Sequence, residues 1–175
     1  MAPEEPSSSI GVERDVLPVV VLVDDDPVSL LALPGVLTTA FEGKASIESF
    51  PDAMSTLGAI EGGLLPAIVV SDQRMPDMSG IDLLRRIQDA HSSTVAIILS
   101  GHAEQHDLLD ALNRVDLHRY LVKPWDPSAV IDAVRTGLEV WESRHSQEVL
   151  ASQVLETNAA LLARNRELER RIDGV

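Results

Sequence analysis

Short apolar runs alternate along this chain with segments of helical pattern, and this alternation restricts the fold more than any other feature. The strand candidates lie at residues 19–23, 45–50, 67–71, 95–99 and 119–122. Most of them are rich in Val, Ile and Leu and are bounded by turn formers, as buried strands are. Helical segments follow at residues 26–33, 52–60, 80–90, 103–114 and from 128 onward. Five strands alternating with helices predict an α/β fold with a doubly wound, five-stranded parallel sheet.

The first helical segment is interrupted by Pro34 and Gly35. Proline has no backbone N–H to donate, and its ring clashes with the carbonyl one turn earlier. We therefore expect a kink or a broken helix at this point.

Composition excludes several classes of protein. The net charge is −14 without a cluster of Lys and Arg, so no direct contact with nucleic acid is expected. The chain has no Cys, which excludes disulfides and thiolate metal sites. No apolar run approaches the roughly 20 residues that span a membrane. Residues 1–15 are acidic, rich in Pro and Ser, and unlike a secretory signal, so we expect a disordered tail on a cytoplasmic protein.

One long helix is predicted from residue 128 to residue 172, because Gly137 is the only helix breaker within it. Its second half has a heptad pattern, with Ala151, Asn158, Asn165 and Ile172 at a and Val154, Leu161 and Leu168 at d. A lone helix folded back on its own domain is the alternative, but so polar a helix is marginal in water. Buried Asn at a position a favours a parallel two-stranded register. We expect a domain at residues 16–140 and a coiled-coil extension at residues 141–175.

Polar side chains end four of the predicted strands. Asp24 and Asp25 follow the first, Asp72 the third, Ser100 the fourth and Lys123 the fifth. Taken singly, each has an ordinary explanation as a helix cap or a solvated charge. The carboxyl ends of parallel strands share one edge, however, and ligands bind there in open α/β sheets. Clustered carboxylates need a cation, and Mg²⁺ with its preference for oxygen ligands would suit a site that holds a phosphoryl anion.

The order and spacing of these residues resemble the receiver domain of two-component response regulators. The matching features are Asp24-Asp25 after an apolar strand, Asp72 followed by Met75-Pro76 and Gly80, Ser100 before a small residue, and Lys123-Pro124. The resemblance covers roughly residues 17–140. It implies a flavodoxin-like fold and phosphotransfer from a histidine kinase or phosphotransfer protein to an aspartate. It implies a signalling domain rather than an enzyme, with at most weak self-dephosphorylation.

Carried over residue by residue, the resemblance makes Asp72 the phosphoacceptor. Asp25 and Asp72 would bind Mg²⁺ directly, and Asp24 would act mainly through water. The backbone carbonyl of Arg74 would be the remaining protein ligand.

The same resemblance assigns the groups around the phosphoryl oxygens. Ser100 would donate a hydrogen bond to one oxygen and Lys123 would pair with another, while Tyr120 occupies the switch position of the family. Arg74 and His102 lie two residues beyond Asp72 and Ser100, where side chains can admit or exclude an attacking water. They are therefore candidates for tuning the phosphoryl lifetime, or they point into solvent.

The leading interpretation is a phosphorylation-activated response regulator that signals as a homodimer through its coiled-coil helix. One alternative is a constitutive coiled-coil scaffold with an unphosphorylated receiver-like head, and another is the first part of a longer regulator with a missing output domain. The complete set of polar groups at the strand ends argues against the scaffold. A metal-dependent phosphatase of related topology is disfavoured by the Met75-Pro76 and Lys123-Pro124 sequences.

Overall fold

The computed structural model describes residues 17–101 and 113–173. Its strands are β1 Val19–Val23, β2 Ser46–Phe50, β3 Pro66–Asp72, β4 Val95–Ser100 and β5 Leu117–Val122. Its helices are α1 Pro27–Ala40, α2 Ala53–Glu61, α3 Gly80–Ala90 and α5 Pro127–Asp173. The helix predicted at residues 103–114 lies largely outside the described residues, as does the predicted tail. All strand pairs are parallel and the order is β2-β1-β3-β4-β5, which confirms the doubly wound, flavodoxin-like prediction.

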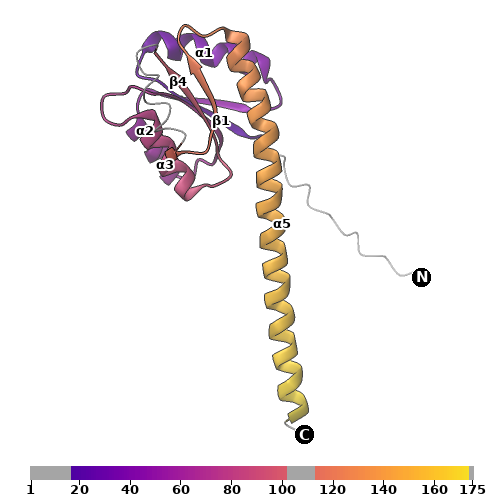
Figure 1. Ribbon diagram of the computed structural model, residues 1–175. Coiled ribbons are helices and arrows are strands. Elements are labelled where there is room, and N and C mark those ends of the chain that lie inside the picture. Colours follow the sequence, from indigo (N-terminus) through magenta and orange to yellow (C-terminus); the bar gives the residue numbers. More distant parts are fainter. Residues whose placement is uncertain (1–16, 102–112, 174–175) are drawn as a thin grey trace, which may run out of the picture.

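Helices cover both faces of the sheet (Figure 1). Successive side chains of a strand point to opposite faces. Val20 and Leu22 therefore join the core beneath α1 and α5, whereas Val21 and Val23 join the core beneath α2 and α3. Every residue of the central strands β3 and β4 is buried. Burial on both faces explains why these strands are almost continuously apolar in sequence.

Helix α1 runs without a break through Pro34 and Gly35, so the predicted broken helix is wrong, while a kink at this point stays a prediction. Leu33 and Leu37 lie one turn apart around Pro34 and are 4% and 0% exposed. Burying each leucine stabilises the fold by about 1.5–3 kcal/mol. An interior proline costs a helix about 3 kcal/mol. The two leucines together therefore offset the proline, which the local sequence pattern does not reveal.

The Gly35→Ala variant is expected to raise the free energy of unfolding by about 0.5–1 kcal/mol, because Ala is the better helix former. Gly35 is exposed, and a methyl group added there meets nothing within 4 Å. Urea titration measures the change. Gly80→Ala is the contrasting control, since its methyl group would overlap the carbonyl oxygen of Asp72. A loss of stability in Gly35→Ala would mean that α1 needs the backbone freedom of glycine there.

Helix α5 packs its first turns on the sheet and then runs on past it as one rod (Figure 1). Val130, Ala133 and Val134 are buried in the core. Gly137 allows the close approach, because a Cβ atom there would lie 3.1 Å from Cδ1 of Ile68. The predicted single long helix is confirmed. In the described residues, no helix combines the length and hydropathy of a membrane span.

Candidate functional site

Three aspartates meet at the carboxyl edge of the sheet. Asp24 and Asp25 follow β1, and Asp72 is the last residue of β3. One carboxylate oxygen from each lies within 4.8 Å of the others. Asp24 and Asp72 are buried, whereas Asp25 is exposed. The parallel topology thus brings together the acids that the sequence places at separate strand ends.

Lys123 extends into this cluster from the end of β5. Its Nζ atom lies 2.5 Å from Oδ1 of Asp72 and 3.1 Å from Oδ2 of Asp24. The backbone N–H of Lys123 donates to the carbonyl of Ser100 at 2.6 Å, which fixes the end of β5 beside β4. The peptide bond that follows Lys123 is cis. One ammonium among three carboxylates leaves the cluster with an excess of negative charge.

Backbone N–H groups orient the two buried carboxylates. The N–H of Asp26 donates to Oδ1 of Asp24 at 2.9 Å, and the N–H of Arg74 donates to Oδ2 of Asp72 at 2.8 Å. Each buried carboxylate therefore uses one oxygen for a backbone N–H and the other for Lys123. This arrangement fixes both side chains before any ligand binds.

Gln73, which no sequence pattern indicated as a site residue, fixes the loop after β3. It is buried, its N–H donates to the carbonyl of Leu99, and its carbonyl accepts from the N–H of Gly80. Its side-chain Oε1 accepts from the N–H of Ile81 at 3.2 Å. Gly80 can come this close only without a side chain, which would overlap the carbonyl oxygen of Asp72. A polar residue after a strand is too common a pattern to reveal this role.

The charged groups of the site perturb one another. Burial raises the pKa of Asp72 above its usual value, and Asp24 raises it further, while Lys123 opposes the shift. Burial alone would lower the pKa of Lys123, but hydrogen bonds to Asp72 and Asp24 hold it above its usual value. Lys123 is therefore an ammonium at neutral pH. Burial destabilises the ionised form of Asp72, and an added cation would stabilise it.

The remaining predicted residues surround this cluster. Ser100 is fully buried, and its Oγ makes no hydrogen bond with any described residue, which is unusual for a buried hydroxyl. Tyr120 is half-buried and packs against the core beneath α2 and α3. The side chain of Arg74 is exposed, and His102 lies outside the described residues. The unused hydroxyl of Ser100 is thus available to an oxygen ligand at this edge.

The donor set fits Mg²⁺. Mg²⁺ takes hard oxygen ligands and is usually bound by one or two carboxylates together with waters. Asp24, Asp25 and Asp72 offer carboxylate oxygens at the required separation, and the exposed Asp25 leaves one side open to water. The carbonyl of Arg74 belongs to the loop that Gln73 fixes beside Asp72. These residues would hold the ion, whose charge would offset the excess negative charge of the cluster.

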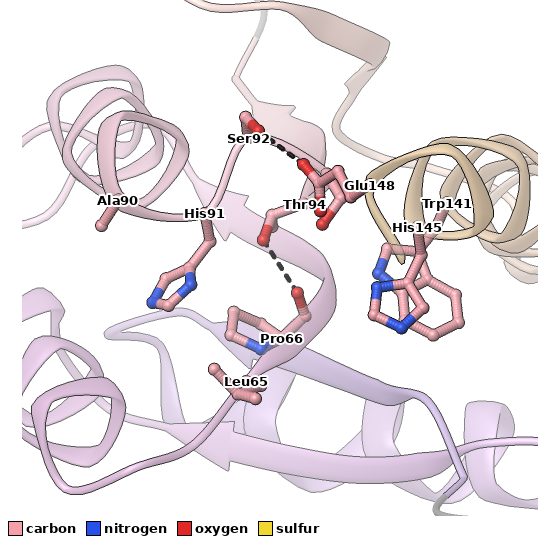
Figure 2. A pocket seen from close by; sticks show the side chains of 10 residues that line it. Leu65, Pro66, Ala90, His91, Ser92, Thr94, Trp141, His145 and Glu148 are labelled. Carbon is pink, nitrogen blue, oxygen red and sulfur yellow. Dashed lines mark hydrogen bonds between the residues drawn. The ribbon is translucent and has the colours of Figure 1, made fainter. Parts of the chain in front are cut away.

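A hollow lies at the opposite edge of the sheet, where α5 leaves it (Figure 2). One hydrogen bond across it joins the helix to the head, because the Oγ of Ser92 donates to Oε1 of Glu148 at 2.6 Å. Trp141 and His145, both on α5, stack on each other with ring centroids 4.9 Å apart. Within the described residues, the three aspartates are the only group with metal-ligand spacing. Beside this hollow, the contact between Ser92 and Glu148 attaches α5 to the segment before β4.

Comparison with known proteins agrees with the geometry. The profile of the family described as "Response regulator receiver domain" matches residues 20–135. The hydrogenase transcriptional regulatory protein HoxA of Bradyrhizobium diazoefficiens is 30% identical over 139 residues, which are 79% of this chain and 28% of HoxA. The transcriptional regulatory protein FixJ of Azorhizobium caulinodans is 32% identical over 162 residues, which are 91% of this chain and 73% of FixJ.

Solved structures show the same likeness. The signal receiver domain of an HD domain-containing protein from Pseudomonas fluorescens Pf-5 superposes with a TM-score of 0.67 at 31% identity, over 73% of this chain and 98% of that one. The family profile at residues 20–135 includes the strand ends that carry the aspartates and the lysine. The chain belongs to the response regulator receiver domain family.

Proposed function

We propose that this chain is a phosphorylation-activated response regulator in which Asp72 accepts a phosphoryl group in a Mg²⁺-dependent reaction. The donor is a histidine kinase or a phosphotransfer protein. The observation that carries the proposal is the position of Lys123 Nζ, 2.5 Å from Oδ1 of Asp72, within a cluster whose three carboxylates lie within 4.8 Å. A phosphoacceptor needs positive charge beside it, here from Lys123 and from an ion that the carboxylates would hold, because phosphoryl transfer depends on positioning and charge neutralisation.

Each polar group of the site has its own role in the proposed phosphoryl transfer. A carboxylate oxygen of Asp72 attacks phosphorus, and the bond from phosphorus to the donor atom breaks, which gives an acyl phosphate. Lys123 favours the ionised form of Asp72 beforehand and pairs with a phosphoryl oxygen afterwards. Ser100 donates its unused O–H to another oxygen. Mg²⁺, held by Asp24, Asp25, Asp72 and the Arg74 carbonyl, would neutralise the phosphoryl oxygens.

The output is proposed to pass through α5. We propose a head at residues 16–140 and a coiled-coil extension of its last helix at residues 141–175, in which the heptads from Ala151 onward pair in parallel with those of a second copy. Repacking of Tyr120 on phosphorylation would change how the two heads meet. Arg74 and His102 are the candidates for tuning the phosphoryl lifetime. We place the protein in the cytoplasm without direct nucleic-acid contact, in keeping with a net charge of −14.

Two alternatives have support of their own. The chain spans only 28% of the length of HoxA and 73% of that of FixJ. Both are named as transcriptional regulatory proteins, which favours the first part of a longer regulator whose output domain follows α5. A constitutive scaffold with an unphosphorylated head is the other alternative, and the exposed apolar side chains of α5 support it equally well.

Asp72→Asn is expected to abolish Mg²⁺-dependent labelling by a small acyl phosphate donor, because the nucleophilic oxygen is lost. Mass spectrometry of the intact wild-type protein should detect the gain of one phosphoryl group, and chelation of Mg²⁺ should prevent it. Asp77→Asn, at an exposed position in the same loop, is the matched control and should label normally. Equal labelling of Asp72→Asn would place the acceptor elsewhere. No labelling of a folded wild-type protein would favour the scaffold.

A further inference from the structure

Helix α5 exposes large apolar side chains beyond the point where it leaves the head. We call residues 151–173 the stalk. Six of its apolar side chains are between 47% and 74% exposed, namely Val154, Leu155, Leu161, Leu162, Leu168 and Ile172. A single helix gains nothing from these residues in water and is marginal by itself. The stalk therefore needs a partner, and the pattern of its flanking residues indicates which one.

The positions beside the heptad core are complementary to each other. The g positions are Leu150, Thr157 and Arg164, and the e positions are Leu155, Leu162 and Glu169. In a parallel dimer without stagger, each g residue faces the e residue five positions later on the other chain. This pairing puts apolar side chains opposite each other near the head and opposite charges near the end of the stalk.

We propose that the stalk pairs with the stalk of a second copy, parallel and in register, and that Arg164 of each chain forms an ion pair with Glu169 of the partner subunit. The inference rests on the proposed dimeric response regulator and specifies its interface. In the same register Leu150 packs on the partner's Leu155, and Asn158 hydrogen-bonds across the core with the partner's Asn158. The occupant of the exposed apolar stripe is thus the same helix of another copy.

Other pairings of the two helices are unfavourable. A shift by one heptad puts the charge of Arg164 opposite the partner's Leu162. An antiparallel pairing puts position a opposite position d, so that Asn158 and Asn165 face leucine or valine. An amide buried against an apolar side chain loses its hydrogen bonds, which is more costly than the bond itself is favourable. Only the parallel, unshifted pairing satisfies both the amides and the charges.

The head leaves this face of the helix open. Trp141, His145 and Glu148 point toward the head, where they line the hollow of Figure 2. At 3.6 residues per turn, the stripe that begins at Ala151 and Val154 lies roughly 120° around the helix from those three residues. Figure 1 shows the lower part of α5 running clear of the sheet and its helices. A second stalk can therefore pack against the first without displacing its own head or the partner's.

The proposed register can be tested by reversing the charge of Arg164 in one chain and that of Glu169 in another. In R164E both g–e contacts of the homodimer become acid against acid, and in E169R they become base against base. Each homodimer is expected to dissociate about tenfold more readily than wild type at low salt. Mixing the two variants restores opposite charges at both contacts, so the heterodimer should predominate over the statistical half. Analytical ultracentrifugation of the full chains measures dissociation, and native mass spectrometry with one isotope-labelled chain measures the heterodimer fraction.

Matched controls use charges that face away from the seam. Arg166 and Glu156 occupy positions b and f, so R166E mixed with E156R should give the statistical mixture. High salt should reduce the preference of the R164E and E169R pair, because the contacts are exposed. If the wild type is dimeric but R164E and E169R form only the statistical mixture, the proposed register is wrong. A wild-type chain that stays monomeric would overturn the stalk dimer, whereas labelling of Asp72, assayed on the same samples, reports separately on the phosphoacceptor.

Discussion

The Lys123→Met variant is expected to lose about 3 kcal/mol of unfolding free energy in Mg²⁺-free buffer. Lys123 Nζ lies between the carboxylates of Asp24 and Asp72, whose side chains are only 6% and 8% exposed. Removing one partner of a buried ion pair costs about 3–5 kcal/mol, because the other charge stays buried without compensation. The side chain of Lys123 is itself 30% exposed, so solvent screening puts the expected loss at the lower end. Urea unfolding followed by circular dichroism measures it.

The loss is expected to depend on pH. Burial raises the pKa of Asp72 in the folded protein. That carboxyl therefore contributes stability below its unfolded pKa, and the contribution is lost as the pH rises through the folded pKa. The raised pKa of Lys123 gives a contribution that is lost only as the pH rises through the alkaline range. The difference between wild type and Lys123→Met should thus be largest near neutral pH and should shrink as acid protonates Asp72.

Two changes should partly reverse the defect. Asp72→Asn in the Lys123→Met background removes one of the two uncompensated carboxylates and should restore part of the lost stability, whereas Asp24 stays buried without its counter-charge. Millimolar Mg²⁺ should also restore part of it by mass action, because we propose that the folded cluster binds the ion. Lys44→Met, at an exposed position, is the matched control and should change stability by less than about 0.5 kcal/mol. An unchanged unfolding midpoint in Lys123→Met would contradict the proposed role of its charge.

The sheet was predictable from the sequence because its central strands are buried on both faces. Val19–Val23 and the run that ends at Asp72 are apolar at nearly every position, which few other structures tolerate. The gathering of Asp24, Asp72 and Lys123 followed from the same fact, since parallel strands end at one edge. In this part of the chain, local pattern and topology point to the same structure.

The features that the sequence did not reveal depend on contacts between residues far apart in the chain. Pro34 indicates a break by any local rule, and only the burial of Leu33 and Leu37 in the core offsets it. The contact between Ser92 and Glu148 joins residues 56 positions apart, and no local pattern predicts it. The same holds for the ion pair between Arg144 and Asp116, whose Nη2 and Oδ2 atoms lie 2.6 Å apart.

These contacts define where a head without its stalk should end. Arg144 and Glu148 both bind the head, so a chain cut before them would lose contacts that hold α5 in place. A chain that ends at Leu150 keeps both contacts and removes the heptad core from Ala151 onward. It should therefore fold and unfold like the head of the full protein.

The chain that ends at Leu150 is expected to be monomeric at concentrations at which the full chain is dimeric. The shortened chain lacks the exposed stripe, whose leucines and valine each contribute about 1.5–3 kcal/mol when fully buried. Light scattering coupled to size exclusion measures the mass of both chains. Leu161→Arg at position d should weaken the full-length dimer, whereas Ala163→Arg at position f should not.

Labelling of the shortened chain separates the head from the stalk. The cluster of Asp24, Asp72 and Lys123 lies at the carboxyl edge of the sheet, and α5 leaves at the opposite edge. The shortened chain should therefore take up a phosphoryl group at the rate of the full chain. If it also dimerises as tightly, the heads carry the interface and the stripe must be covered by a different partner. If it is monomeric but labels normally, dimerisation and phosphoryl chemistry reside in separate parts of the chain, and α5 is the physical link between them.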